Sequence, residues 1–222
     1  VGTGGDTLTA GDGDDSITGN TGADQLYGDG GNDTIKGAGN TADILGGGAG
    51  SDVITGTGGN DTIWGDLAAA GDTVGGGNDI IATGAGANSA NGGAGNDSIT
   101  GGAAVDKLFG ENGNDTIVGA DGADSLYGGA GNDIITDAAG ASSIEGGAGN
   151  DSLTGAADAD TIKGGDGNDT IAGDAAADSL YGDAGDDIIT SGAAADTVYG
   201  GTGNDLITDA GGASLLDGDA GN

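Results

Sequence analysis

Several residue types on which proteins usually rely are absent from this sequence. It contains no cysteine, histidine, methionine or proline. Without cysteine there are no disulfides and no thiol chemistry, and without histidine the commonest general base and imidazole metal ligand are missing. Most catalytic arrangements built on an activated nucleophile therefore have no residues to use. We expect no enzymatic activity from this chain.

Positive charge is also scarce. Three lysines, Lys36, Lys107 and Lys163, stand against 37 aspartates and glutamates, which gives a formal net charge of −34. This charge excludes nucleic acid and anionic membranes as partners. The carboxylates also repel one another in any compact state, so a folded form requires counter-cations. Oxygen ligands without histidine or cysteine favour hard cations, calcium above all.

Long hydrophobic runs are missing too. No apolar stretch approaches the roughly 18 residues of a membrane span, and no signal peptide opens the chain, so direct membrane insertion is not expected. The chain begins without methionine and ends inside a repeat at Gly221-Asn222. We expect residues 1–222 to be a single segment of a longer protein.

Glycine, in contrast, is very abundant, with 57 residues. A collagen triple helix is excluded because glycine does not recur at every third position and proline is absent. A disordered linker is disfavoured because aliphatic residues recur at even intervals, which disordered low-complexity segments seldom show. The composition therefore indicates a structural repeat.

The repeat is nine residues long and has the form Asp-x-aliphatic. It is seen at Asp6, Asp15, Asp24 and Asp33, then every nine residues from Asp97 to Asp133, and in the register of this second group from Asp151 to Asp205. Carboxylate pairs could serve a glycosidase, but here they recur at a regular period instead of converging on one cleft. Each unit has a glycine-rich half and a short strand half, as in residues 164–172.

Alternation within each short strand predicts the fold. The middle residue is aliphatic and its neighbours are mostly small or polar, so the middle residue points inward. The inward residues predicted in this way are Ile99, Leu108, Ile117, Leu126, Ile135, Ile144, Leu153, Ile162, Ile171, Leu180, Ile189, Val198 and Ile207. Two nonapeptide units then close one flattened coil of about 18 residues, with a strand on each side and a glycine turn at each end. About twelve coils stack into two parallel sheets, an all-β parallel β-solenoid.

The motif Gly-Gly-x-Gly-x-Asp-x-aliphatic-x resembles the repeat of the RTX (repeats-in-toxin) family. The best matches are residues 92–99, 128–135, 146–153, 164–171 and 200–207. The resemblance implies a calcium-loaded parallel β-roll, with each ion between neighbouring turns on one edge, so that Asp151 and Asp169 share a site. Calcium takes six to eight oxygens, and a glycine turn can point several carbonyls inward. The alternative is that Gly-Asn-Asp only forms tight turns in a metal-free solenoid.

The two edges of the coil are not equivalent in sequence. From Asp79 to Asp205, in steps of 18, every unit keeps glycine two residues before its aspartate. On the other edge that glycine is replaced at Ala104, Asp158, Ala176 and Ala194, and the aspartate is lost at Asn88, Ser142 and Ser214. We expect one continuous calcium row, one patchy row and a different turn shape on the second. The candidate calcium ligands are Asp15, Asp33, Asp52, Asp61, Asp79, Asp97, Asp115, Asp133, Asp151, Asp169, Asp187 and Asp205, with Asp24 and Asp124 on the poorer edge.

Counting in nines predicts an irregularity between residues 37 and 78. Asp15, Asp33 and Asp52 fall on one edge, whereas Asp61 and Asp79 fall on the other. The well-formed row must then change sides. Residues 67–72 also break the turn pattern, and we expect a bulge or a distorted coil in this stretch.

Two functions agree with these features. The first is an extracellular structural or adhesive module of a surface layer, a biofilm matrix or an adhesin, which folds on binding calcium. The alternative is the repeat block of a type I secreted toxin or enzyme, in which calcium triggers folding after export. Both imply a secreted or cell-surface location. A catalytic domain in the flanking sequence would favour the second.

Outward apolar residues favour the structural role. Tyr27, Phe109, Tyr127, Tyr181 and Tyr199 follow an inward aliphatic on one set of strands, and Ile80, Ile134, Ile188 and Leu206 precede one on the other set. Rows of apolar residues on a flat sheet are candidate contact faces. We expect lateral association with copies of this chain or with other surface proteins, once calcium screens the charge.

Ligand binding is a third class of function. An ice-binding face requires a regular outward ladder of threonine or asparagine. The third residue of the well-formed units varies, being alanine at Ala94, asparagine at Asn112 and threonine at Thr202, so we expect no such ladder. The few aromatic residues match a polysaccharide-binding groove only in part.

Overall fold

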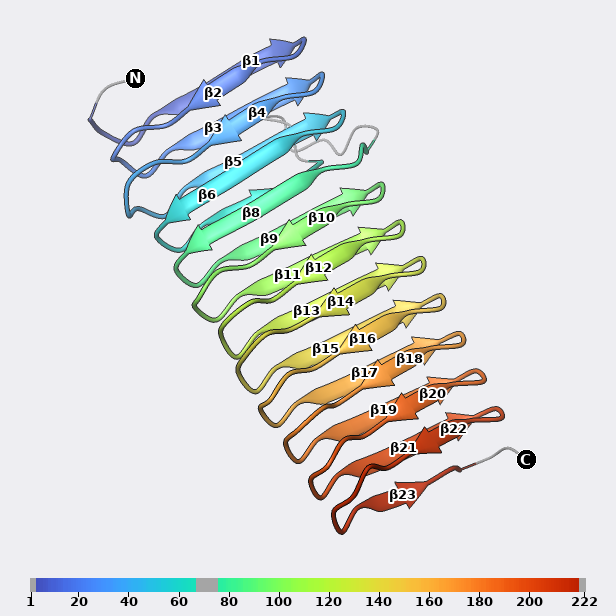
Figure 1. Ribbon diagram of the computed structural model, residues 1–222. Coiled ribbons are helices and arrows are strands. Elements are labelled where there is room, and N and C mark those ends of the chain that lie inside the picture. The colour runs from blue at the N-terminus through green and yellow to red at the C-terminus, as the bar shows by residue number, and fades with distance from the viewer. Residues whose placement is uncertain (1–2, 67–75, 220–222) are drawn as a thin grey trace.

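A computed structural model describes residues 3–66 and 76–219 of the chain. Within these ranges the chain forms 23 short strands and no helix, so these residues include no helix that could cross a membrane. The strands wind as a solenoid of stacked coils, and the two chain ends lie at opposite ends of the stack (Figure 1). The predicted all-β parallel solenoid is confirmed.

The coils build two parallel sheets that face each other. The long-strand sheet has 12 strands in the order β1-β3-β5 through β23, and the short-strand sheet has 11 strands in the order β2-β4-β6 through β22. The strands of the long-strand sheet are β1 (Thr7–Asp12), β3 (Gln25–Gly30), β5 (Ile44–Ala49), β7 (Thr62–Trp64), β9 (Ser89–Ala94), β11 (Lys107–Asn112), β13 (Ser125–Ala130), β15 (Ser143–Ala148), β17 (Thr161–Asp166), β19 (Ser179–Ala184), β21 (Thr197–Thr202) and β23 (Leu215–Asp217). Those of the short-strand sheet are β2 (Ser16–Thr18), β4 (Thr34–Lys36), β6 (Val53–Gly58), β8 (Ile80–Ala85), β10 (Ser98–Thr100), β12 (Thr116–Val118), β14 (Ile134–Thr136), β16 (Ser152–Thr154), β18 (Thr170–Ala172), β20 (Ile188–Thr190) and β22 (Leu206–Thr208).

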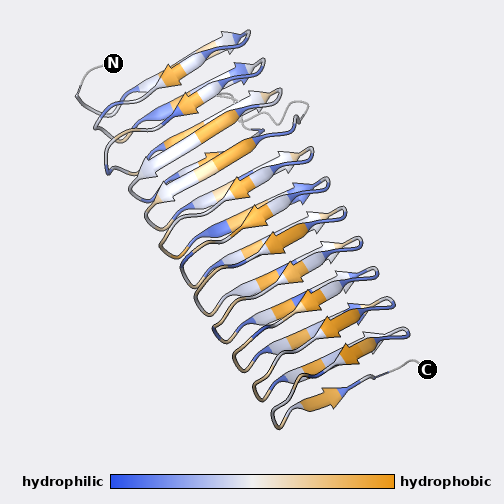
Figure 2. Ribbon diagram, in the orientation of Figure 1, coloured by the Kyte–Doolittle hydropathy of each residue, from blue (hydrophilic) through white to orange (hydrophobic). Residues whose placement is uncertain are grey.

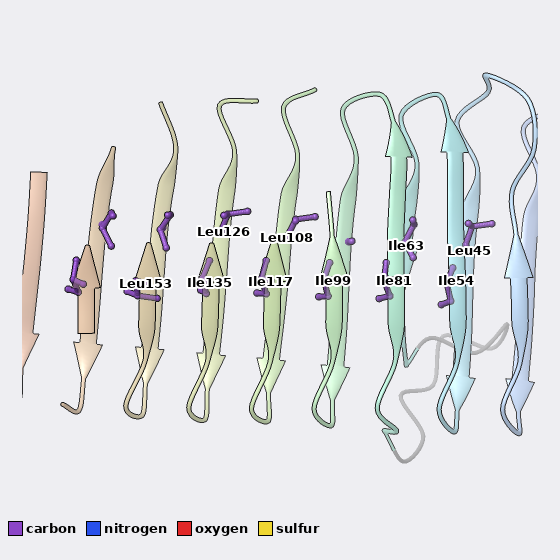
Figure 3. Packing of buried hydrophobic residues seen from close by; sticks show 14 of the residues in the cluster. Leu45, Ile54, Ile63, Ile81, Ile99, Leu108, Ile117, Leu126, Ile135 and Leu153 are labelled. Carbon is purple, nitrogen blue, oxygen red and sulfur yellow. The ribbon is translucent and has the colours of Figure 1, made fainter. Parts of the chain in front are cut away.

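The core is a double row of aliphatic side chains, one row from each sheet. Leu45, Ile63 and Leu108 come from the long-strand sheet and Ile54 and Ile99 from the short-strand sheet, and all point into the space between the sheets (Figure 3). Of the predicted inward residues, all are at most 1% exposed except Ile207, which is partly buried against the cluster. Burial of each side chain of this size stabilises the fold by roughly 1.5–3 kcal/mol. The predicted alternation is confirmed.

Hydropathy follows the same plan along the rod. Most strands carry a hydrophobic band, whereas the turns contain both hydrophilic and weakly hydrophobic residues (Figure 2). Such a thin core leaves every turn at the surface of the rod. The chemistry of the molecule therefore lies in its two edges of turns.

The register of the strands is regular except between β3 and β9. Ile99 pairs with Ile117 at the normal length of one coil. The coil from Ile35 to its partner Ile54 is one residue longer, and the coil from Ile54 to its partner Ile81 is longer by a whole nonapeptide. The extra length lies between the strands, because one more residue inside a strand would turn its inward side chain to the outside. Residues 67–72, where we expected the turn pattern to break, lie outside the described residues.

Candidate metal centre

The turns that lead from the long-strand sheet to the short-strand sheet form the first edge of the rod. Each first-edge turn ends in an aspartate, and these aspartates form a row along the rod. The backbone N–H of each aspartate donates to Oδ1 of the aspartate one coil later. The bond from Asp151 to Asp169 measures 2.8 Å, as does the bond from Asp169 to Asp187. The aspartates of the row are Asp15, Asp33, Asp52, Asp79, Asp97, Asp115, Asp133, Asp151, Asp169, Asp187 and Asp205.

The row does not change sides, so that prediction was wrong. Asp52 donates to Asp79 across a separation of 27 residues, which keeps Asp79 on the edge of Asp15 and Asp33. Asp61 lies on the opposite edge, because its N–H donates to Asn88. The physical reason is that the chain between β7 and β8 is one nonapeptide longer than the corresponding segment of a regular coil, which counting in nines cannot distinguish from half a coil.

The second carboxylate oxygen of the first-edge aspartates has no hydrogen-bond partner, although it is buried. The side chains of Asp97, Asp115 and Asp133 are at most 2% exposed. The unpartnered atoms are Oδ2 of Asp33, Asp52, Asp79, Asp97, Asp115, Asp133, Asp151, Asp169, Asp187 and Asp205. A buried carboxylate oxygen without a partner is costly, so a row of ten indicates that something else binds there.

The space beside the first glycine of each first-edge turn is a cradle of oxygen atoms. A Cβ added to Gly164 would collide with Oδ2 of Asp169 and lie 2.7 Å from the carbonyl oxygen of Gly182. The same pair of oxygens, one from the aspartate and one from the next coil, surrounds Gly110, Gly128 and Gly146. No three acidic, histidine or cysteine side chains cluster in the part of the chain that the structure describes. Backbone carbonyls must therefore supply much of the ligand set, which fits calcium because this ion accepts six to eight oxygens of either kind.

Burial raises the pKa of these carboxylates and so disfavours their ionised form when no cation is bound. Desolvation raises the pKa of Asp97 and Asp115 from 3.8 to about 6 and that of Asp169 to about 7. The pKa of Asp79 rises to about 8, first because of burial and further because of the neighbouring carboxylates of Asp97 and Asp52. Charged carboxylates in this row are thus stable only beside a compensating positive charge.

The turns that return to the long-strand sheet form the second edge, and most of their aspartates are satisfied locally. Oδ2 of Asp24 accepts the N–H of Asn20 at 2.7 Å, and Oδ2 of Asp61 accepts that of Thr57 at 3.3 Å. Asp106 and Asp160 accept in the same way from the residue four positions earlier. Asp124, Asp178 and Asp196 keep Oδ2 unpartnered. Of the second-edge candidates, Asp24 and Asp61 have used their oxygens, whereas Asp124 has one free.

The two edges also differ in backbone conformation, as predicted. The glycine two residues before the first-edge aspartate has a positive φ, for example 136° at Gly149 and 125° at Gly167. The second-edge residues Ala104, Ala176 and Ala194 are not among those with positive φ. A side chain at a left-handed position is strained, so alanine requires a turn of another shape.

An asparagine ladder on the first edge was missed from the sequence. Each residue before the row aspartate donates its N–H to the side chain of its counterpart one coil earlier, as from Asn132 to Asn114 at 2.7 Å. These bonds run opposite in direction to the aspartate bonds, so the two ladders together join adjacent coils. The expected absence of an ice-binding ladder concerned the third turn residue and stays a prediction, because these asparagines lie at the fifth position and bond within the rod. The asparagines are Asn32, Asn78, Asn96, Asn114, Asn132, Asn150, Asn168 and Asn204.

The cradle predicts the effect of a single added methyl group. We expect Gly164→Ala to lower the free energy of unfolding in saturating calcium by about 1–3 kcal/mol, the usual cost of overpacking, because the new Cβ enters the space between Asp169 and Gly182. Guanidinium unfolding of parent and variant in calcium measures this difference.

Gly218→Ala is the matched control. A Cβ at Gly218 meets no atom within 4 Å and its φ is not positive. We expect the unfolding midpoint of this variant to stay within experimental error of the parent. An equally small effect at Gly164 would show that the space beside it is not an ion cradle.

Comparison with known proteins agrees with this geometry. No curated protein matches the chain. The family model described as the RTX calcium-binding nonapeptide repeat (4 copies) matches almost all of it, in residues 1–35, 37–68, 73–108, 100–135, 127–162, 136–171, 163–198 and 190–222. The chain therefore belongs to the RTX calcium-binding nonapeptide repeat family.

Proposed function

We propose that this chain is an extracellular structural or adhesive module that folds when calcium binds along its first edge. The aspartates from Asp33 to Asp205 would hold the ions through Oδ2, together with glycine carbonyls of the adjoining turns. When bound, the ions would supply the positive charge that ten buried carboxylates require. The observation that carries the proposal is the unbroken row of unpartnered Oδ2 atoms.

A mechanical role without catalysis agrees with the arrangement of the chain. The acidic residues recur along the whole rod at the repeat period instead of gathering at one site. The sequence has no histidine or cysteine that could form a catalytic group with them. Calcium is abundant outside cells, where modules of this kind bind it with Kd values of about 10⁻⁴–10⁻³ M. A secreted or cell-surface location would supply calcium in that concentration range.

An aromatic stripe lies along the outer face of the long-strand sheet. Phe109 stacks on Tyr127 with ring centroids 4.9 Å apart, and Tyr181 stacks on Tyr199 at 5.4 Å. Lys107 lies over the ring of Phe109, 4.9 Å from its centroid. The strand register places Tyr27 and Trp64 at the same position of their strands as these rings, so they belong to the same stripe. Trp64 was not predicted from the sequence.

An aliphatic stripe lies on the short-strand sheet, on the other side of the rod. Ile80, Ile134 and Ile188 are 55%, 51% and 48% exposed. Val53 adjoins Ile80 in the same column and Leu206 adjoins Ile188. Two apolar stripes on opposite faces would let a rod contact one neighbour on each side.

Calcium-dependent lateral association tests this role. At millimolar calcium we expect the parent chain to form oligomers, since bound calcium offsets a formal charge of −34 that otherwise holds rods apart. The triple variants Ile80→Ser/Ile134→Ser/Ile188→Ser and Tyr127→Ser/Tyr181→Ser/Tyr199→Ser should each weaken association by about tenfold or more. Sedimentation velocity across a calcium series measures the effect.

The control removes methyl groups from the neighbouring column of the same sheet. Thr100→Ser/Thr136→Ser/Thr190→Ser should associate like the parent. If the folded parent stays monomeric at high concentration in calcium, the structural role is wrong. The repeat block of a type I secreted toxin or enzyme would then remain, because calcium-triggered folding does not require contact between rods.

A further inference from the structure

Two second-edge turns carry an exchange of residue types that the repeat does not explain. Where the sixth turn position loses its aspartate to Ser142, the first position, usually glycine, is Asp137. The same exchange occurs further along the rod, at Ser214 and Asp209. A carboxylate lost at one end of the turn is thus present at the other end.

The structure brings the moved carboxylate of Asp137 to the aspartate of the preceding coil. A Cβ added to Gly119 would lie 2.5 Å from Oδ1 of Asp137 and 2.8 Å from Oδ2 of Asp124. The two oxygens therefore converge on the same space. In the first edge, the corresponding space beside Gly164 is shared by Oδ2 of Asp169 and the backbone carbonyl of its counterpart glycine one coil later. Asp137 is itself the counterpart of Gly119 one coil later, so its side chain replaces that carbonyl.

Both carboxylates are buried and incompletely satisfied. Asp124 is 2% exposed and Asp137 is 8% exposed. Oδ2 of Asp124 and both oxygens of Asp137 lack a partner with good hydrogen-bond geometry, although the Ser142 hydroxyl and the Ala138 N–H lie close enough to Asp137 to lower its pKa. Ser142 also accepts the N–H of Asp124 at 2.9 Å. Two buried carboxylates that converge in this way repel each other, and a cation between them would offset their charge.

The second pair has the same residues at the same spacing. Oδ2 of Asp196 is unpartnered and the side chain is 2% exposed. Asp209 lies at the same sequence distance after Asp196 as Asp137 does after Asp124. The N–H of Asp196 donates to the Ser214 hydroxyl at 3.2 Å. Oδ1 of the half-buried Asp209 accepts the hydroxyl of Ser191 at 3.3 Å and the N–H of Gly211 at 3.1 Å.

We propose that the second edge holds two cation sites of its own, one built by Asp124 and Asp137 and one by Asp196 and Asp209. Each would take a hard divalent cation, calcium, because all the side-chain donors are carboxylate or hydroxyl oxygens. Ser142 and Ser214 would add a hydroxyl beside each ion. The inference rests on the proposed calcium-dependent fold only for the identity of the ion.

The third second-edge turn without aspartate sets the contrast. At Asn88 the first turn position is Thr83, so no carboxylate has moved there. The counterpart of Asp124 is Asp61, whose N–H donates to Asn88, and its carboxylate is satisfied because Oδ2 accepts the N–H of Thr57 at 3.3 Å. The loss of the aspartate at the sixth turn position alone therefore does not leave two converging, unpartnered carboxylates. They occur where an aspartate is also present at the first turn position.

Counting ions tests the proposal. In equilibrium dialysis at saturating calcium, we expect Asp137→Asn/Asp209→Asn to bind two fewer calcium ions per chain than the parent, and Asp137→Asn alone to bind one fewer. The control Asp121→Asn/Asp174→Asn removes the same charge from exposed positions of second-edge turns, and its count should equal that of the parent. Equal non-zero counts in the parent and the Asp137→Asn/Asp209→Asn variant would overturn the two sites and leave the first-edge row intact.

The parent chain supplies a test that does not depend on a variant folding. A crystal structure grown in calcium should show an ion between Asp124 and Asp137. Ions along the first edge with none at this position would contradict the second-edge sites alone. A folded parent that binds no calcium at all would refute the proposed function itself.

Discussion

Removal of calcium should convert this chain from a folded rod to a largely disordered polymer. Without the ions, ten buried and unpartnered carboxylate oxygens on the first edge have nothing to offset their charge. With Kd values of about 10⁻⁴–10⁻³ M, 10 mM calcium stabilises the fold by about 1.4–2.7 kcal/mol for each site. Ten such sites contribute roughly 14–27 kcal/mol, more than the usual net stability of about 5–15 kcal/mol. Binding energy is then folding energy.

A calcium titration followed by circular dichroism measures this coupling. We expect the β signal to appear cooperatively in the millimolar range and to disappear on addition of chelator. Magnesium at the same concentration should be far less effective, because it requires a strict octahedral site and gives up its water reluctantly. A full β signal in excess chelator at low salt and neutral pH would contradict the idea that the ions hold the fold together.

The fold was predictable because two periods in the sequence act independently. Alternation within three residues assigns Ile117 and Leu126 to the inside, and the nine-residue period places successive strands on opposite sides of a coil. Neither inference needs long-range information. The edge on which Asp79 lies did require long-range information. One additional nonapeptide between two strands moves all later aspartates to the other edge in a count of nines, although the nine-residue pattern itself is unchanged. Turns absorb such insertions, whereas strands do not.

The candidate site was predictable in outline but not in detail. The glycine pattern indicated the first-edge row, and the structure places those aspartates in one ladder. The sequence cannot show which carboxylate oxygens already accept a hydrogen bond. Asp24 and Asp33 look alike in sequence, but in the structure Oδ2 of Asp24 accepts the N–H of Asn20. Asp137 was missed because it occupies the first position of the repeat motif, where glycine and not a ligand side chain is expected. Its only signal was aspartate in place of the first glycine in the same turn that carries Ser142.

Acid should restore structure to the calcium-free chain, in contrast to most proteins. Burial raises the pKa of Asp52 and Asp133 in the folded chain to about 6, that of Asp169 to about 7 and that of Asp79 to about 8, against a value near 3.9 in the unfolded chain. The folded state therefore binds protons more tightly. Stability from these groups is fully present below the unfolded pKa and is lost as pH rises through the folded values.

The expected result is a gain of β signal as a calcium-free solution is acidified from pH 8 to about pH 4, over the window set by these pKa values. The change in net charge acts in the same direction, because the isoelectric point is about 4.1 and repulsion falls as it is approached. High salt at pH 7 separates the two causes, since salt screens surface repulsion but protonates no buried carboxylate. Dilute samples checked by sedimentation exclude aggregation as the source of the signal. If salt at pH 7 restores as much structure as acid does, surface repulsion and not the buried row keeps the metal-free chain unfolded; if neither restores any, protons cannot take the place of the cations on the first edge.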